Sequence, residues 1–397
     1  MAQMLERYVY KNQKKMRCGY TTGTCAAAAA KAAAQMLLSG RKVTEVSVRT
    51  PSDITLTLPV CEIQMKAHAV SCAVQKDSGD DPDITNKILI FAEVSYIYNS
   101  SNIVNDTAAV KPQIIVDGGV GIGRITKKGL ARPVGAAAIN PVPLKMIEAA
   151  LKETAEAFGY EGGLQAVISA PQGVEIAKKT FNPQLGITGG ISILGTSGIV
   201  EPMSEQALID TIRTEMKMHL ADGEQTLLIT PGNYGQDFLH ETLKIELKRS
   251  IKCSNFIGDT IDMGCELGAK GMLFVGHIGK LVKLGAGIMN THSKMADGRM
   301  EILAACAVRA GAGIETVRNI LDCVTTDAAL ELLKNEKILG KTMEQLMLRI
   351  DACLQKRGGD NMQIGAVVFS NEYGLLGKTE QADELLLKIT ADVSSEK

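Results

Sequence analysis

The chain has 397 residues, 45% of them apolar, and this length suits two packed domains better than one. Its 43 basic and 44 acidic residues give a net charge of -1, which excludes the strongly basic surface of a typical nucleic-acid-binding protein. Aromatic residues make up only 4% of the chain and tryptophan is absent, so we expect no base-stacking platform.

The first part of the chain predicts one long helix followed by strands. Residues 25–38 are rich in alanine and end at Ser39-Gly40, as expected for a strong helix with a glycine stop. Four alternating, β-branched runs then predict a mainly antiparallel sheet: residues 43–49, 54–60, 67–74 and 88–98. Residues 100–111 are expected to form an exposed loop, and two prolines open a helix over residues 144–158.

From residue 165 onward, short apolar strands alternate with helices. The expected strands are each followed by a glycine-rich or glycine-containing turn, and they cover residues 166–169, 191–194, 227–230 and 272–275. Such alternation predicts right-handed crossovers and a parallel sheet that binds ligands at the carboxyl ends of its strands. We therefore expect an α+β domain over residues 1–160 with a mainly antiparallel sheet. An α/β, Rossmann-like domain with a mainly parallel sheet is expected over residues 161–397.

The nine cysteines do not predict a disulfide framework. Their number is odd, no pair has CxxC spacing, and Cys25, Cys306 and Cys353 lie in helix-like runs typical of small core residues. No segment reaches the roughly 20 apolar residues of a membrane span, and the N-terminus lacks a secretory apolar core. These features predict a cytoplasmic protein with no membrane partner, and they leave open a homo-oligomer.

A threonine- and glycine-rich run stands directly before the alanine-rich helix. Thr24 is a candidate N-cap, and Thr21 and Thr22 precede it. The free amides and the dipole of a helix N-terminus favour an anion, so the run is a candidate ligand site. The alternative is an ordinary helix cap, which would need only one threonine.

Two further polar turns have both a binding and a structural interpretation. The run at residues 76–83 contains Lys76 and Asp81, but it lacks the glycine and the terminal glutamate of an EF-hand. Arg124 follows a glycine-rich turn that matches neither the dinucleotide fingerprint nor a P-loop. Both turns could bind a charged ligand, Arg124 through a bidentate contact with a carboxylate. The alternatives are a solvated turn and a solvated basic hairpin.

The histidines offer little support for a metal site or a hydrolase. His277 and His292 lie near glycine- or Ser/Thr-rich turns, but a zinc site would need a third ligand at suitable spacing, and none is present. We therefore predict no protein-bound metal. A Gly-x-Ser-x-Gly elbow is also absent. Each histidine could act directly on a ligand or could be structural.

Seven motifs occur in order between about residues 17 and 305. They are GYTTGTCAAAAAKAA, KDSGDDPDIT, GVGIGRITKKGL, INPVP, KTFNPQLGITGGISILGTSGIVEPMSE, GNYGQDF and FVGHIGKLVKLGAGIMNTHSKMADGRMEIL. Together they resemble the cobalt-precorrin-5B C(1)-methyltransferase family (CbiD) of anaerobic cobalamin biosynthesis. The resemblance covers most of the chain, and its fifth motif is highly specific.

The resemblance implies methyl transfer from S-adenosylmethionine to ring carbon C-1 of a tetrapyrrole substrate that carries the cobalt. Because such a transfer is an in-line displacement, catalysis can depend largely on orientation. We expect the methyl donor on residues 161–397 and the substrate on residues 1–160, with His277 as the first choice of base if a proton must leave. The expected donor contacts are Gly195, Thr196, Ser197, Gly198, Glu201, Gly232, Asn233 and Gly276. The expected substrate contacts are Thr21, Thr22, Thr24, Lys76, Asp81 and Arg124.

Two other classes of function remain as alternatives. A non-catalytic corrinoid carrier would bind the tetrapyrrole and show no affinity for S-adenosylmethionine. An enzyme acting on a phosphorylated small molecule would use the same glycine turns and ignore tetrapyrroles. The missing phosphate fingerprints argue against the second, and the ordered motifs argue against both.

Overall fold

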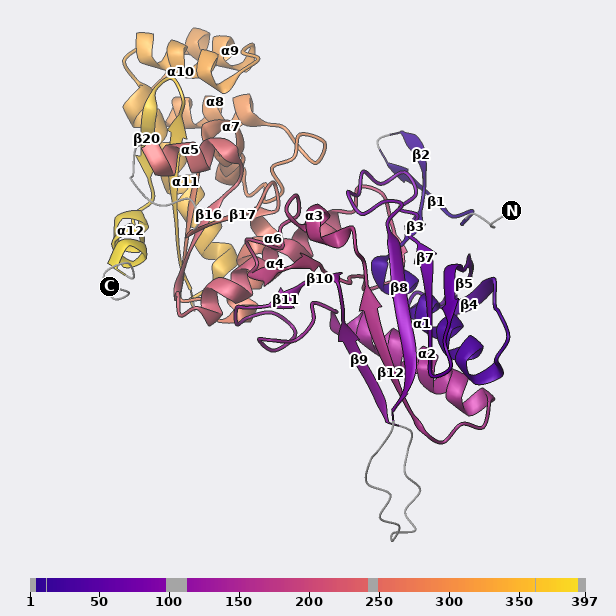
Figure 1. The fold of residues 1–397 in the computed structure, drawn as a ribbon. Coiled ribbons are helices and arrows are strands. Elements are labelled where there is room, and N and C mark those ends of the chain that lie inside the picture. The colour runs from indigo at the N-terminus through magenta and orange to yellow at the C-terminus, as the bar shows by residue number, and fades with distance from the viewer. Residues whose placement is uncertain (1–4, 12, 98–112, 242–248, 361, 392–397) are drawn as a thin grey trace. The chain divides into compact units, whose positions relative to one another are not determined.

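The structure is a computed structural model that describes residues 5–11, 13–97, 113–241, 249–360 and 362–391. Its contacts divide the chain into two compact units, residues 1–204 and 205–397 (Figure 1). The loop predicted at residues 100–111 lies outside the described residues.

The first unit is built around a five-stranded sheet with the order β6-β7-β8-β12-β9. Its neighbours are antiparallel except for β12 and β9, which run parallel. The main elements of this unit are α1 (Thr22–Ser39), α2 (Pro141–Ala157), β6 (Cys61–Met65), β7 (Ala69–Gln75), β8 (Leu89–Ile97), β9 (Ile114–Gly118) and β12 (Gly163–Ser169). The predicted mainly antiparallel sheet is confirmed only in part, because β7 and β8 are two of its four expected strands. The other two, β4 and β5, pair with each other in a separate sheet, and β6, β9 and β12 take their places.

Shorter elements complete the first unit, most of them paired two by two. They are β1 (Tyr8–Lys11), β2 (Lys14–Arg17), β3 (Gly19–Tyr20), β4 (Glu45–Arg49), β5 (Thr55–Pro59), β10 (Gly121–Ile122), β11 (Arg124–Ile125), α3 (Gly173–Ala177), β13 (Ile187–Thr188), β14 (Gly190–Ile191) and β15 (Ile199–Val200). The pair β15-β3 joins residues near 200 to the segment that precedes α1.

Helix α1 is buried on nearly all sides, which explains its alanine content. It packs against α2 and against β7 and β8, and Figure 1 shows both helices beside the same sheet. Side chains as small as alanine allow this close approach, and a helix that is apolar all round belongs in a core. The helix ends as predicted, because Gly40 adopts the left-handed conformation with φ +69°.

The second unit contains a sheet with the order β17-β16-β18-β19-β20, parallel except for β20. Its strands are β16 (Thr226–Thr230), β17 (Ser250–Lys252), β18 (Gly271–His277), β19 (Gln363–Ser370) and β20 (Gly374–Lys378). Its helices are α4 (Glu205–Ala221), α5 (Asn233–Glu241), α6 (Ile257–Leu267), α7 (Ile278–Leu281), a 3-10 helix (Val282–Ala286), α8 (Arg299–Arg309), α9 (Ile314–Leu321), α10 (Thr326–Asn335), α11 (Leu339–Gly358) and α12 (Ala382–Ala391).

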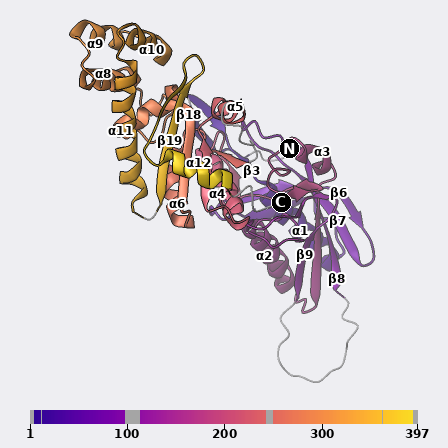
Figure 2. The same ribbon diagram turned by 90° about the vertical axis from the view of Figure 1, so that its left-hand side faces the viewer.

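Helices cover both faces of this second sheet. Leu227 and Ile229 contribute to a cluster with side chains of α4, α6, α8 and α11, whereas Leu228 contributes to a second cluster with side chains of α5 and α12. Figure 2 shows α11 and α12 against different sides of β19. Strands buried on both faces are apolar throughout rather than alternating, as in LLI of β16.

The division of the chain differs from the expected boundary at residue 160. Strand β12 lies between β8 and β9 in the sheet of the first unit, and β14 pairs with β10 of the same unit. Two of the four strands expected in one parallel sheet therefore belong elsewhere. The apolar pattern of a short strand shows that it is buried, but it does not identify its hydrogen-bonding partner.

Candidate functional site

The parallel strands of the second unit end at one edge of their sheet. Because β16, β17, β18 and β19 run in the same direction, their carboxyl ends lie together. The strands end there at Thr230, Lys252, His277 and Ser370. We call these residues, with the turns 231–233, 253–254 and 278–280, the carboxyl edge. It is the candidate site because it brings four separate segments together.

His277 ends β18 and has one of its ring nitrogens engaged. Its Nδ1 accepts a hydrogen bond of 3.0 Å from the backbone N–H of Gly279. Burial lowers the pKa of His277 below its usual value, and the carboxylate of Asp327 partly opposes this shift. The neutral ring then carries its proton on Nε2, which can donate to a ligand. This arrangement favours hydrogen-bond donation by His277 over the role of base that the sequence suggested.

Two lysines at the carboxyl edge were missed by the sequence analysis. Lys280 donates to the carbonyl oxygens of Pro231 at 2.5 Å and Ser254 at 3.4 Å, and Lys252 donates to the side-chain oxygen of Asn233. Both lysines therefore contact the turn that follows β16, and Lys280 also contacts the turn that follows β17. The position of Lys280 just after a predicted strand was visible in the sequence. Strand β17, which ends at Lys252, was not predicted, and neither was the order of the strands.

Gly232 and Asn233 reach the surface of the carboxyl edge, whereas Gly276 is buried. A Cβ at Gly232 would have one atom within 4 Å, Nζ of Lys280 at 3.7 Å, so the space above this glycine is open. A Cβ at Gly276 would lie 3.0 Å from the side chain of Leu281, so this glycine allows close packing inside the unit. Gly232 and Asn233 are the two expected donor contacts that the structure places on an open edge.

The turn at residues 194–198 lies against the N-terminus of α1, in the first unit and not at the carboxyl edge. Thr24 donates its hydroxyl to the carbonyl of Gly198 at 2.7 Å, and the N–H of Gly23 donates to the carbonyl of Leu194 at 2.9 Å. A Cβ at Gly195 would lie 2.4 Å from Oγ1 of Thr21. The glycines of this turn therefore allow close packing on the helix, which corrects the expected grouping with Gly232.

The other expected contacts near this turn also have partners inside the first unit. Ser197 exchanges hydrogen bonds with the backbone of Ile199, and Glu201 forms an exposed ion pair with Arg7 at 3.5 Å. Thr22 donates to the carbonyl of Leu194 and accepts from its N–H. Thr196 is exposed. Glu201, an expected donor contact, is thus not among the residues of the carboxyl edge.

The N-cap of α1 is Thr21 and not Thr24. The hydroxyl of Thr21 accepts from the N–H of Thr24 at 3.2 Å, and Thr24 is completely buried inside the first turn. The helix begins earlier than the alanine run because residues 22–24 adopt helical geometry and bury their side chains. The N–H groups of Gly23, Thr24 and Cys25, which were expected to bind an anion, donate to acceptors within the protein.

Lys76 and Asp81 fold the polar turn at residues 76–83 onto itself and onto its neighbours. Lys76 is 2% exposed and donates to Asp83 and Ser78, both at 2.5 Å. Burial acts to raise the pKa of Asp83, but Lys76 and Thr85 outweigh it and the pKa is lowered. Asp81 accepts from the N–H of Met203 at 2.9 Å. This network gives both residues a structural role.

Arg124 is partly exposed, unlike Lys76, and is the third charged residue expected to contact the substrate. Its guanidinium forms a bidentate pair with Asp117 at 2.7 and 2.9 Å, and it also donates to the carbonyl of Gly118 at 2.6 Å. The side chains of Arg124 and Asp117 are 43% and 46% exposed. The predicted carboxylate-binding fork is therefore formed, with a carboxylate of the protein as its partner.

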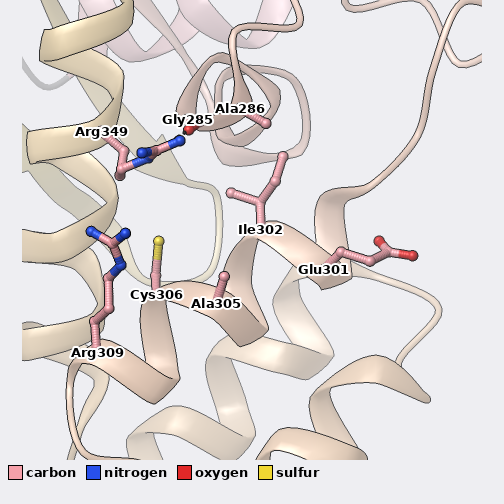
Figure 3. A pocket seen from close by; sticks show the side chains of 8 residues that line it. All are labelled: Gly285, Ala286, Glu301, Ile302, Ala305, Cys306, Arg309 and Arg349. Atoms are coloured by element: carbon pink, nitrogen blue, oxygen red, sulfur yellow. Dashed lines mark hydrogen bonds between the residues drawn. The ribbon is translucent and has the colours of Figure 1, made fainter.

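A cavity of about 250 Å³ lies elsewhere in the second unit, between α8, α11 and the 3-10 helix (Figure 3). Arg309 projects from α8 and Arg349 from α11, and Arg349 donates to the carbonyl of Gly285 at 3.1 Å. The cavity is lined by Gly285, Ala286, Glu301, Ile302, Ala305, Cys306, Arg309 and Arg349. It includes no residue of the carboxyl edge, and His292 is not part of it.

In the part of the chain that the structure describes, no three or more His, Cys, Asp and Glu residues are grouped so that they could hold a metal ion. None of its helices combines the length and the apolar character needed to cross a membrane.

The chain is similar to known proteins over nearly its whole length. Residues 9–202 match the family model described as CbiD, and residues 290–380 match the model described as CbiD, C-terminal domain. Proteins named cobalt-precorrin-5B C(1)-methyltransferase are 47% identical to it in Ruminiclostridium cellulolyticum, over 92% of both chains, and in Alkaliphilus metalliredigens, over 96% of this chain and 97% of that one.

A solved structure is also similar in sequence. It is the cobalamin biosynthesis protein (cbiD) from Archaeoglobus fulgidus, 27% identical, with 74% of this chain and 87% of that chain covered and a TM-score of 0.39. The two chains superpose too loosely for a comparison of individual residues. The two family models and the 47% identical relatives, which cover 92% and 96% of its residues, show that the chain belongs to the CbiD family.

Proposed function

We propose that this protein methylates carbon C-1 of cobalt-precorrin-5B in cobalamin biosynthesis. The observation that supports this most strongly is the 47% identity to curated relatives with that name, which extends over both units. The test is to incubate the purified protein with cobalt-precorrin-5B and S-adenosylmethionine carrying a deuterated methyl group. The expected product gains one labelled methyl group in its mass spectrum, and unchanged substrate would contradict the proposal.

S-adenosylmethionine is the proposed methyl donor, and the carboxyl edge of the second unit is its proposed site. Three features of that edge fit such a ligand. Gly232 leaves open space beside the ammonium of Lys280, Asn233 is exposed, and Nε2 of His277 is available as a donor. The hydroxyl of Thr230, at the end of β16, has no partner among the described residues. Bound there, the sulfonium would supply an electrophilic methyl group.

The protein contributes mainly binding and orientation to this reaction. Displacement at a methyl group needs an in-line approach, and fixing two reactants in that geometry contributes up to about 7–11 kcal/mol. The turn after β16 and the first turn after β18 come from rigid strands, so they can hold a ligand in one orientation. His277 would donate from Nε2 to an acceptor atom of a bound ligand rather than remove a proton.

For the tetrapyrrole, the structure favours a smaller set of contacts than the sequence suggested. Thr24 and Lys76 are buried, and Thr21, Thr22 and Asp81 bind backbone groups of the first unit. Arg124 remains a proposed contact, because its half-exposed pair with Asp117 could exchange the aspartate for an acetate or propionate group of the substrate. The other five are no longer proposed as direct contacts.

Gly232→Leu tests the donor site directly. The new side chain would fill the space beside Lys280, so we expect affinity for S-adenosylhomocysteine to fall at least about tenfold while the fold is retained. Isothermal titration calorimetry measures the affinity, and thermal unfolding checks the fold. The matched control is Gly340→Leu in α11, where a Cβ also meets open space. Equal affinity of the two variants for S-adenosylhomocysteine would show that the donor does not bind at this edge.

The two alternative functions predict other outcomes in the same experiments. A corrinoid carrier would bind a tetrapyrrole and give no calorimetric signal with S-adenosylhomocysteine. An enzyme acting on a phosphorylated small molecule would bind a nucleotide and ignore the tetrapyrrole.

A further inference from the structure

The carboxyl edge carries a group of cations with no acidic partner among the described residues. Lys252 and Lys280 lie at the carboxyl edge, and Lys283 lies in the 3-10 helix that follows it. The hydrogen-bond partners of the three are an amide oxygen and backbone carbonyl oxygens. The ion pairs of the described residues include none of the three. Most other lysines with a short polar contact have a carboxylate nearby, so this group is unusual within the protein.

Lys280 and Lys252 both reach the turn that follows β16. The strand order β17-β16-β18 places that turn between the segments that carry them. Lys280 comes from the side of β18 and contacts the carbonyl of Pro231, whereas Lys252 ends β17 and contacts the side chain of Asn233. Two positive charges therefore converge on one short turn.

The ammonium of Lys280 keeps capacity for a ligand. It has three N–H donors, and two are used by the carbonyls of Pro231 and Ser254, the second in a long contact of 3.4 Å. Gly232 places no side chain over it, since even a Cβ there would remain 3.7 Å from Nζ. Burial lowers the pKa of Lys280, and the nearby Lys252 and Lys283 act in the same direction, as expected for a cation that lacks a counter-charge.

We propose that Lys280, together with Lys252, binds a carboxylate group of one of the reacting molecules at the carboxyl edge. This inference rests on the proposed function. The carboxylate has two possible sources, the amino-acid end of the methyl donor and an acetate or propionate group of the tetrapyrrole. Either would supply the missing negative charge, and a charge-assisted hydrogen bond to Lys280 would fix the orientation of the ligand.

The experiment compares ligands with and without the carboxylate. S-adenosylhomocysteine carries the amino-acid carboxylate and 5′-methylthioadenosine lacks it, while uroporphyrin III serves as a polycarboxylate tetrapyrrole probe. Calorimetric affinities are measured for the unmodified protein, Lys280→Gln and Lys252→Gln. The control is Lys270→Gln, an exposed lysine just before the opposite end of β18. Lys252 is exposed, so its variant keeps the test valid if Lys280→Gln does not fold.

The donor is the source if both variants lose about tenfold in affinity for S-adenosylhomocysteine and keep their affinity for 5′-methylthioadenosine. The tetrapyrrole is the source if only the affinity for uroporphyrin III falls. A purely structural lysine would lower thermal stability without changing the preference between these ligands, and this would overturn the proposal while leaving the proposed function intact. If the unmodified protein bound none of the probes, this result would contradict the proposed function. It would also contradict the carboxylate site, which rests on that function.

Discussion

One hydrogen bond decides what the other nitrogen of His277 can do. Because Nδ1 accepts from the N–H of Gly279, the neutral ring has its proton on Nε2 and its free edge is a donor. A sequence shows that a histidine stands after an apolar strand, but it does not show which of its nitrogens is engaged. The structure therefore supplies the reason to propose His277 as a donor rather than as a base.

The buried position of His277 also predicts a dependence of stability on pH. Its pKa is lower in the folded protein than the 6.5 of an unperturbed histidine, so protons bind preferentially to the unfolded chain. Its contribution to the free energy of unfolding is complete above about pH 6.5 and is lost as the pH falls below it towards the folded pKa.

His277→Asn removes this contribution. Urea unfolding measured between about pH 5 and 8 should show a weaker loss of stability on the acidic side for the variant than for the unmodified protein. Parallel curves for the two proteins over that range would show that His277 titrates equally in both states.

At the scale of elements, the turn 194–198 packs directly against the N-terminus of α1. The threonines supply hydroxyls to carbonyl oxygens of the turn, and the glycines allow the turn to approach them. The sequence identified both segments as special, because three threonines and several glycines exceed what a simple cap needs. It assigned them to ligands because nothing in either run shows that its partner lies some 170 residues away.

Gly198→Ala tests this packing. The residue has φ +80°, and a Cβ would lie 2.7 Å from Cβ of Thr50 and 3.0 Å from Oγ1 of Thr24. Strain and overpacking together should lower the free energy of unfolding by about 2–4 kcal/mol. Urea unfolding provides the measurement. Gly340→Ala, in a helix and facing open space, is the control and should be neutral or stabilising by up to about 1 kcal/mol. Equal stability of the two variants would refute the packing role.

The carboxyl edge is likewise a property of elements and not of single residues. Lys252, His277 and Lys280 belong to three successive segments of the chain, and Ser370 comes from a still later strand. They come together because four strands are parallel. Predicting the strand ends was possible from apolar runs and the turns after them. Predicting which ends are neighbours needed the strand order 17-16-18-19, which local sequence patterns do not contain.

For the whole molecule, the two units have separate hydrophobic cores. The core clusters of residues 1–204 contain no residue of the second unit, and those of residues 205–397 contain none of the first. A core that is complete within one unit is the condition for independent folding.

The division after residue 204 can be tested with fragments. We expect fragments 1–204 and 205–397 each to unfold cooperatively on heating, as followed by circular dichroism. A fragment ending at residue 160 lacks β12, which pairs with both β8 and β9, so it should fail to give a cooperative transition. Cooperative unfolding of fragment 1–160 without that of fragment 1–204 would restore the boundary expected from the sequence.

The sequence alone determined the family, the alanine-rich helix, the mixed α/β character with both antiparallel and parallel strand pairs, and the importance of the turns that follow apolar strands. Those properties follow from ordered motifs, residue propensities and periodicity, which are local. Only the tertiary structure decided that β12 and the turn 194–198 belong to the first unit, and that Thr24 and Lys76 are buried. It also identified Lys252 and Lys280 as neighbours of Gly232. The physical reason is that hydrogen-bond partners and burial depend on contacts between distant segments, which the local pattern of a segment does not specify.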